Sequence, residues 1–161
     1  MAEIALTRLE DERLRVIAQR IIDTQSAEQT ELMGYREEFY GSPDPAPLDG
    51  PTMGLMMEAM PGMGSMDEMM FQMDAAAQVA AICAAEDADL AFIDLTIPHH
   101  EMAIVASEAA LTQASNPEIV AFAQRVIDDQ SAEIDELTSI RTEIAGGTPQ
   151  ARAGLLGRLA A

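Results

Sequence analysis

The sequence has no lysine and no tryptophan, and its charge is strongly biased toward one sign. Nine arginines stand against 28 aspartate and glutamate residues, which gives a formal net charge of −19 at pH 7. A nucleic acid is itself a polyanion, so a chain this acidic would repel it, and nucleic-acid binding is excluded as a function. The same charge would concentrate cations near the surface, although a solvated acidic surface accounts for it equally well.

Cysteine, aromatic residues and long apolar runs are also scarce. Cys83 is the lone cysteine, so an intrachain disulfide is excluded, and its alanine neighbours predict a small thiol packed in the core. Because no apolar stretch reaches about eighteen residues, we expect no membrane span. The first five residues are acidic and helical in character, so we expect no secretion signal in the chain as it stands.

What the chain does contain is alanine, leucine, isoleucine and methionine in helical patterns. At 161 residues we expect one domain, with an all-α fold. Apolar residues three and four positions apart predict an amphipathic helix over 117–145, which Gly146-Gly147 ends. Similar patterns and capping residues predict a helix that ends at Gly41, one over 66–83 and one over 87–114.

The chain also repeats itself. Residues 1–39 aligned without a gap on residues 106–144 share 17 identical positions of 39, most densely at 18–28 against 123–133. This similarity predicts an internal duplication of a helical hairpin. Carried backward, the alignment places the counterparts of His99 and His100 upstream of Met1. We therefore expect the natural chain to start earlier or to be processed, and a degenerate first copy is the alternative.

Two polar residues interrupt the apolar face of each long helix. At 100° per residue, Gln130 and Glu133 fall in the middle of the apolar arc, as do their counterparts Gln25 and Glu28. A carboxylate on a buried face is costly unless it is paired, protonated or bound to a metal. Gln130 and Glu133 are therefore candidate metal ligands. The alternative is that the glutamates extend to the edge of the bundle or pair with Arg36 and Arg141.

Methionines are concentrated between the two copies, with nine of them in the 21 residues from Met53 to Met73. Thioethers are soft ligands that favour Cu(I), so Met60 and Met63, on a segment rich in glycine and proline, are candidate metal ligands. A loop that folds back over the bundle is the alternative for this segment. The later methionines follow a capping box at Ser65 and Glu68, so we expect them to pack as core on the helix over 66–83.

The two histidines of the chain, His99 and His100, are adjacent. Neighbouring residues on a helix point about 100° apart, so we expect one ring to face the core and the other a groove. With Asp94, Glu101 and Met102 close by, the pair offers nitrogen, oxygen and sulfur ligands, which suit copper or zinc better than magnesium or calcium. Histidines that serve only as structural hydrogen-bonding groups are the alternative.

Pro98 lies directly before this pair. It removes one backbone donor and should kink the helix over 87–114. The alternative is that a new helix begins here, with Thr96 as its cap.

These residues resemble the domain of unknown function 305 family. The resemblance rests on Ile97-Pro98-His99-His100 with the alanines after it, on the helix that contains Gln130 and Glu133, and on Met60-Pro61-Gly62-Met63. It implies a ferritin-like four-helix bundle built from two repeats, often exported, with copper-binding members linked to copper resistance. By position, His99 and His100 match the family's histidine pair, and Asp89 and Asp94 match acidic positions before it. Leu95-Thr96 departs from the methionine pair that relatives carry, and the first histidine pair is absent.

The expected architecture is therefore one helical bundle domain over residues 1–145. It comprises repeat 1 (1–40), a linker rich in Met, Pro and Gly (41–65) and repeat 2 (66–145), followed by a C-terminal tail (146–161). The resemblance implies a periplasmic or other extracytoplasmic location, and a genuine start at Met1 would imply the cytoplasm. Homo-oligomerisation stays open.

The function that we expect is copper binding and homeostasis, with copper ahead of zinc or iron as the bound metal. The candidate ligands are His99, His100, Asp94, Asp89, Met102, Glu133, Gln130, Met60 and Met63. One alternative is a di-metal ferritin-like oxidoreductase, but such sites use Glu-x-x-His motifs and no glutamate lies three residues before either histidine. The other is a helical interaction module without a metal.

Overall fold

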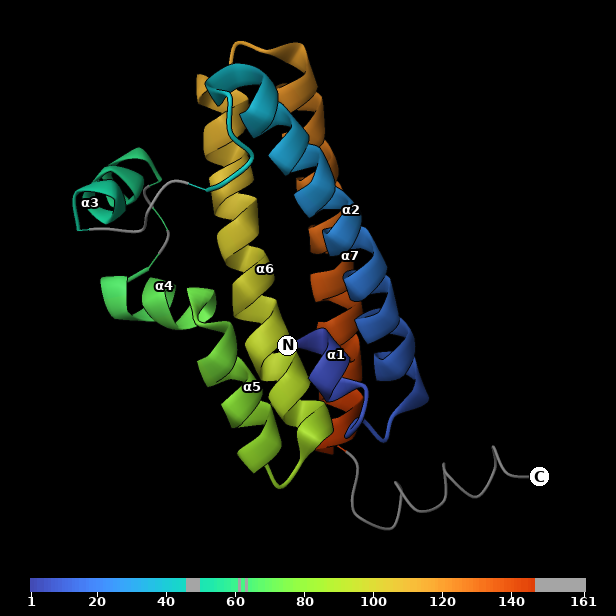
Figure 1. Cartoon of the computed structure of the whole chain (residues 1–161). Helices are drawn as coiled ribbons and strands as arrows, with labels where there is room; N and C mark the ends of the chain where they lie inside the picture. The colour runs from blue at the N-terminus through green and yellow to red at the C-terminus, as the bar shows by residue number, and fades with distance from the viewer. Residues whose placement is uncertain (46–49, 61, 63, 147–161) are drawn as a thin grey trace.

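The structure is a computed structural model that describes residues 1–45, 50–60, 62 and 64–146. All regular structure in these residues is α-helical, which confirms the all-α prediction (Figure 1). The helices, in chain order, are α1 (Ala2–Ala5), α2 (Glu12–Tyr40), α3 (Gly50–Ala59), α4 (Met66–Met73), α5 (Ala75–Ala84), α6 (Ala88–Gln113) and α7 (Pro117–Gly146). None of the described helices is both long and apolar enough to cross a membrane.

Three long helices and a short fourth one form the bundle. Helices α6 and α7 pack against each other along their lengths, and α2 lies beside α7 (Figure 1). Ion pairs join α2 to α7, for example Arg13 to Glu143 at 2.6 Å and Arg125 to Glu31 at 2.7 Å. The fourth position is taken by α5, which packs on the N-terminal part of α6.

The prediction of a single helix over 66–83 is wrong, because the helix is interrupted at Asp74. The carboxylate of Asp74 accepts hydrogen bonds from the backbone N–H groups of Ala76 and Ala77, both at 3.0 Å. Aspartate favours such N-cap geometry over a helix interior, so α4 ends and α5 begins at this residue. Helix α4 consequently points away from the axis of α5 (Figure 1).

The segment between the repeats also differs from the prediction. Residues Gly50–Ala59 form helix α3, and Met53 is buried on it, although no helical packing was expected for the methionines before Met63. Leucine and methionine are good helix formers, and this preference overrides the two glycines of the segment. Met63 itself lies outside the described residues.

The main apolar core lies at one end of the bundle, where α1, α5 and the nearby ends of α2, α6 and α7 meet. Its members are Ala2, Ala5, Leu9, Leu14, Ile17, Ala18, Ile21, Ile82, Phe92, Ile93, Leu137, Ile140 and Ile144. Cys83 is exposed rather than buried as predicted, because α5 turns Gln78 and Ile82, one turn apart, toward the core.

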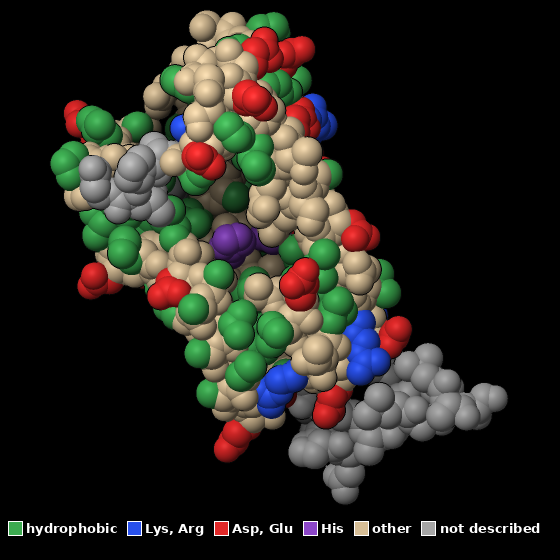
Figure 2. Space-filling model, viewed as in Figure 1, with side chains coloured by type: hydrophobic (Ala, Val, Ile, Leu, Met, Phe, Trp, Pro, Cys, Tyr) green, Lys and Arg blue, Asp and Glu red, His purple; other side chains and the backbone are tan. Residues whose placement is uncertain are grey.

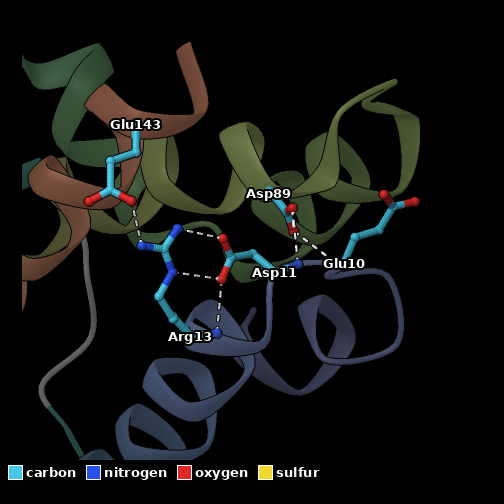
Figure 3. A network of polar contacts seen from close by, with 5 residues as sticks. All are labelled: Glu10, Asp11, Arg13, Asp89 and Glu143. Carbon is cyan, nitrogen blue, oxygen red and sulfur yellow. Dashed lines mark hydrogen bonds and ion pairs between the residues drawn. The ribbon is translucent and has the colours of Figure 1, made fainter. Parts of the chain in front are cut away.

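A polar network fixes the start of α2 at this end of the bundle (Figure 3). Asp89, buried on α6, accepts hydrogen bonds from the backbone N–H groups of Glu10 at 2.8 Å and Asp11 at 3.1 Å. Asp11 caps α2 and also binds Arg13, which reaches Glu143 on α7. The network therefore connects α2, α6 and α7.

Helix α6 continues through Pro98 without interruption, so the alternative in which Thr96 begins a new helix is wrong. The buried residues of α6 are Ala88, Asp89, Phe92, Ile93, Thr96, His100 and Ser107. They recur at helical spacing, and His100 belongs to this buried face.

Candidate metal centre

His100 lies in the interior of the bundle, with none of its surface exposed. Its Nε2 is 2.8 Å from Oε2 of Glu133, across the interface between α6 and α7. An ionised carboxylate can only accept a hydrogen bond, so the imidazole Nε2 carries the proton that is donated. In the neutral ring Nδ1 then has a free lone pair, and no hydrogen-bond partner reaches this buried atom from the described residues.

Glu133 is buried as the sequence predicts, and it is paired. It accepts hydrogen bonds from His100 and from Arg20 Nε on α2, the latter at 2.9 Å. Burial alone would raise the pKa of Glu133, but the hydrogen bonds from His100 and Arg20 more than offset it and leave the pKa below its usual value. Glu133 is therefore ionised at neutral pH and fixes the orientation of the His100 ring.

The arginine that pairs with Glu133 is not the one named by the alternative from the sequence. Arg141 binds Asp94, with Nε 2.6 Å from Oδ1, and Arg36 donates to the backbone carbonyl of Asp44. Arg20 instead bridges Glu133 and Glu136. Helical periodicity locates residues on one helix, but the pairing across helices depends on how α2 and α7 meet.

His99 is partly exposed, so the two rings differ in burial as predicted. Figure 2 shows histidine surface at the bottom of a hollow. Nδ1 of His99 is 3.3 Å from the backbone carbonyl of Gln72. Because a carbonyl oxygen only accepts a hydrogen bond, Nδ1 of His99 is the donor and Nε2 has the lone pair. Burial, with a smaller effect of His100, lowers the pKa of His99, which favours the neutral ring. The ring centroids of His99 and His100 are 6.3 Å apart, and the planes are tilted by 49°.

The other predicted ligands differ from the histidines in burial and in hydrogen-bond partners. Gln130 is buried, and its Oε1 has no hydrogen-bond partner among the described residues. Met102 and Met60 are half-buried. Asp94 is exposed and bound to Arg141, and Asp89 is occupied by the backbone of Glu10 and Asp11. Within the described ranges, no three His, Cys, Asp or Glu side chains come together as a group that could hold a metal ion.

The methionine-rich segment runs along α6 toward His99. Gln113, at the end of α6, donates to the carbonyl of Ala59 at 3.1 Å, and Gly62 lies close to Val105. Gln72 in turn contacts His99. Later residues of the segment therefore contact earlier residues of α6: Ala59 contacts Gln113, and Gln72 contacts His99. The methionines of α3 and α4 are thus brought to the side of α6 on which His99 lies.

The pattern of the family described as domain of unknown function (DUF305) matches residues 1–141. The chain belongs to the DUF305 family. No curated protein matches this DUF305 chain.

The fold of this DUF305 protein is similar to that of solved structures of a copper-binding protein. The structure described as CopM in the Cu(I)-bound form has a TM-score of 0.68 and 26% identity, and the match covers 91% of this chain and 85% of that chain. CopM in the Cu(II)-bound form gives 0.66 and 25%, with coverage of 88% and 84%. A co-crystal of CopM with silver gives 0.65 and 26%, with coverage of 88% and 82%.

Sequence reasoning missed three participants in the centre of this DUF305 protein: Arg20, Gln72 and Thr96. The hydroxyl of Thr96 is buried one turn before His100 and has no hydrogen-bond partner in the described part of the chain. Its spacing of four residues from His100 was the signal that could have placed it on the same face. Gln72 acts through its backbone carbonyl, which no side-chain pattern can reveal.

Proposed function

We propose that this protein binds copper as cargo, with His99 and His100 as nitrogen ligands and methionines of the segment over residues 53–63 as sulfur ligands. The observation that carries the proposal is the state of His100. Its Nε2–H is held by Glu133 while Nδ1 stays buried without a partner.

Histidines that ligate metals almost always donate their other ring N–H to a carboxylate or carbonyl, which fixes the tautomer and raises ligand basicity. His100 has a carboxylate partner and His99 a carbonyl partner. Each ring consequently has one nitrogen with a lone pair for a metal, which is Nδ1 in His100 and Nε2 in His99. A histidine with a purely structural role would instead have both buried nitrogens satisfied.

The chemistry of the donors favours copper over the common divalent ions. Imidazole suits copper and zinc, and thioethers favour Cu(I), whereas magnesium and calcium require oxygen ligands. The similarity to structures described as Cu(I)-bound, Cu(II)-bound and silver-bound CopM supports the same assignment.

The test is a Cu(II) competition titration against glycine, with the double variant His99→Gln/His100→Gln. A glutamine amide can still donate to Glu133 and to the carbonyl of Gln72, but the lone pair of its nitrogen is delocalised into the amide and is not available to a metal. We expect affinity for Cu(II) to fall at least about tenfold, because both nitrogen ligands are removed. A double variant that binds Cu(II) as the unchanged protein does would contradict the proposal.

A matched pair of variants tests the role of the carboxylate. Glu133→Gln should weaken Cu(II) binding by about 10-fold to 100-fold, the usual effect of removing the group that orients a metal-bound histidine. Glu28→Gln changes the corresponding residue of the first repeat. Glu28 makes no hydrogen bond to either histidine in the described structure and interacts with His100 only through its charge, so this variant should weaken Cu(II) binding less than Glu133→Gln does.

A further inference from the structure

The exposed methionines of α4 form a feature that the histidine centre does not use. Met66, Met70 and Met73 are 40%, 53% and 36% exposed, whereas Met69 between them is only 1% exposed. The sequence predicted that all four would pack as core, and only Met69 does. Three thioethers therefore face solvent on a helix of eight residues.

The three exposed residues share one face of the helix. Their spacing of four and then three residues places them within an arc of about 60°, with Met70 between the other two along the helix axis. Residues three and four apart on a helix have Cβ atoms about 5–6 Å apart. Because methionine has three rotatable bonds beyond its Cα, the three sulfur atoms can converge on one ion above Met70.

We propose that Met66, Met70 and Met73 form a surface site for a soft monovalent cation, Cu(I) or its analogue Ag(I), from which the ion is passed to the histidine pair. The inference rests on the proposed function for the identity of the cargo, and it adds a second site with different ligands. Thioethers select soft ions, so this site would exclude Zn(II), which the imidazoles could also bind.

The position of α4 supports transfer between the two sites. Gln72, the residue before Met73, contacts His99 through its backbone carbonyl at 3.3 Å. The last turn of α4 thus carries a thioether of the surface site and also touches a predicted ligand of the inner site. Helix α4 stands out from the bundle in Figure 1, so packing alone does not account for a stripe of three methionines on its outer face.

The local charge also suits a cation. Asp67 and Glu68 lie in the first turn of α4, and Asp74 follows its last residue. These carboxylates add to a chain whose net charge is −19, so the potential around the methionines attracts positive ions. No basic residue lies between Met66 and Met73.

The experiment uses the full chain labelled with ¹³C at the methionine methyl groups and titrated with Ag(I), which needs no reductant. The methyl signals of Met66, Met70 and Met73 should shift together as one equivalent is added, and Zn(II) should not shift them. The triple variant Met66→Leu/Met70→Leu/Met73→Leu should bind one equivalent of Ag(I) fewer. Leucine has a similar volume and helix propensity, so the helix should be retained. Met69→Leu, the buried control, should bind Ag(I) as the unchanged protein does.

The double variant His99→Gln/His100→Gln separates this inference from the proposed function. If the surface site exists, the three methyl signals still shift with Ag(I) in that variant, whether or not Cu(II) binding is lost. Methyl signals that stay unchanged in both proteins, or a triple leucine variant with full Ag(I) stoichiometry, would overturn the surface site and leave the histidine centre unaffected.

Discussion

Glu28 and Glu133 end identical Gln-Ser-Ala-Glu segments, at 25–28 and 130–133, yet their environments are opposite. Glu133 accepts hydrogen bonds from His100 and Arg20, and its pKa is lowered. Glu28 is half-buried and has no hydrogen bond or ion pair within the described part of the chain. Burial, reinforced by Asp129 and Glu133, raises its pKa. The local sequence is the same around both carboxylates, so it does not determine their different pKa shifts. The residues that face each carboxylate from the neighbouring helices do.

The arginines, in contrast, form equivalent pairs in the two copies. Arg20 binds Glu136, and its counterpart Arg125 binds Glu31, the counterpart of Glu136 at the same offset. Such reciprocal pairs are what a duplication predicts for two copies that face each other. The asymmetry then centres on the histidine that faces Glu133 and has no equivalent facing Glu28.

The largest expected difference is in stability. Glu133→Ala should lower the free energy of unfolding by about 2–3 kcal/mol, because it leaves the buried Nε2 of His100 without its acceptor. Glu28→Ala should change stability by less than about 1 kcal/mol, since no hydrogen bond is lost. Urea unfolding of the two variants, in the absence of metal, measures both values. Equal losses would show that the two carboxylates are equivalent after all.

The pH dependence of stability should separate the same two residues. The lowered pKa of Glu133 means that its contribution is present above its unfolded pKa and is lost as the pH falls through the folded pKa. The raised pKa of Glu28 has the reverse effect, so stability falls as the pH rises from the usual value of 4.5 through the folded pKa. Glu28→Gln should remove this loss of stability. The variant should therefore gain stability relative to the unchanged protein as the pH rises from 4.5 through the folded pKa of Glu28.

Carboxyl ¹³C titration by NMR measures the pKa values of Glu28 and Glu133 directly. The Glu28 signal should titrate at higher pH than the Glu133 signal. A common midpoint for both signals would contradict the comparison.

The smallest expected difference lies in the arginines. Arg20→Gln should cost about 1–2 kcal/mol of stability, because the buried carboxylate of Glu133 then retains only His100 as a partner. Arg125→Gln should cost less than Arg20→Gln, since Glu31 is more exposed than Glu133 and solvent replaces the lost ion pair. Thermal unfolding of the two variants at low and high salt measures the difference. A larger loss for Arg125→Gln would reverse the order given by burial.

Local signals in the sequence predicted the long helices well. Helix α7 was expected over 117–145 and spans Pro117–Gly146, and α6 was expected over 87–114 and spans Ala88–Gln113. Asn116 before Pro117 and the Gly146-Gly147 pair at the other end are local features of the sequence, and they predict the ends wherever the helix packs. The identity of Glu133 as a buried polar residue followed from the same periodicity.

The methionine-rich region could not be predicted in the same way. Between Met53 and Ala84 most residues are alanine, methionine or glycine, so no polar face shows which side is buried. Which methionines are exposed depends on the break at Asp74 and on how α4 meets α6. The pairing of Glu133 with Arg20 likewise depends on the register of α2 against α7, which neither helix encodes alone.

The off-centre position of the apolar core has a consequence for motion. In the described residues, neither α3 nor α4 contributes a member to that cluster. Detaching α4 would expose Met69 and break the contact of Gln72 with His99, while the cluster stayed closed. The backbone amides of α4 should therefore exchange with deuterium through local opening, far faster than those around Phe92, whose exchange requires unfolding of the whole bundle.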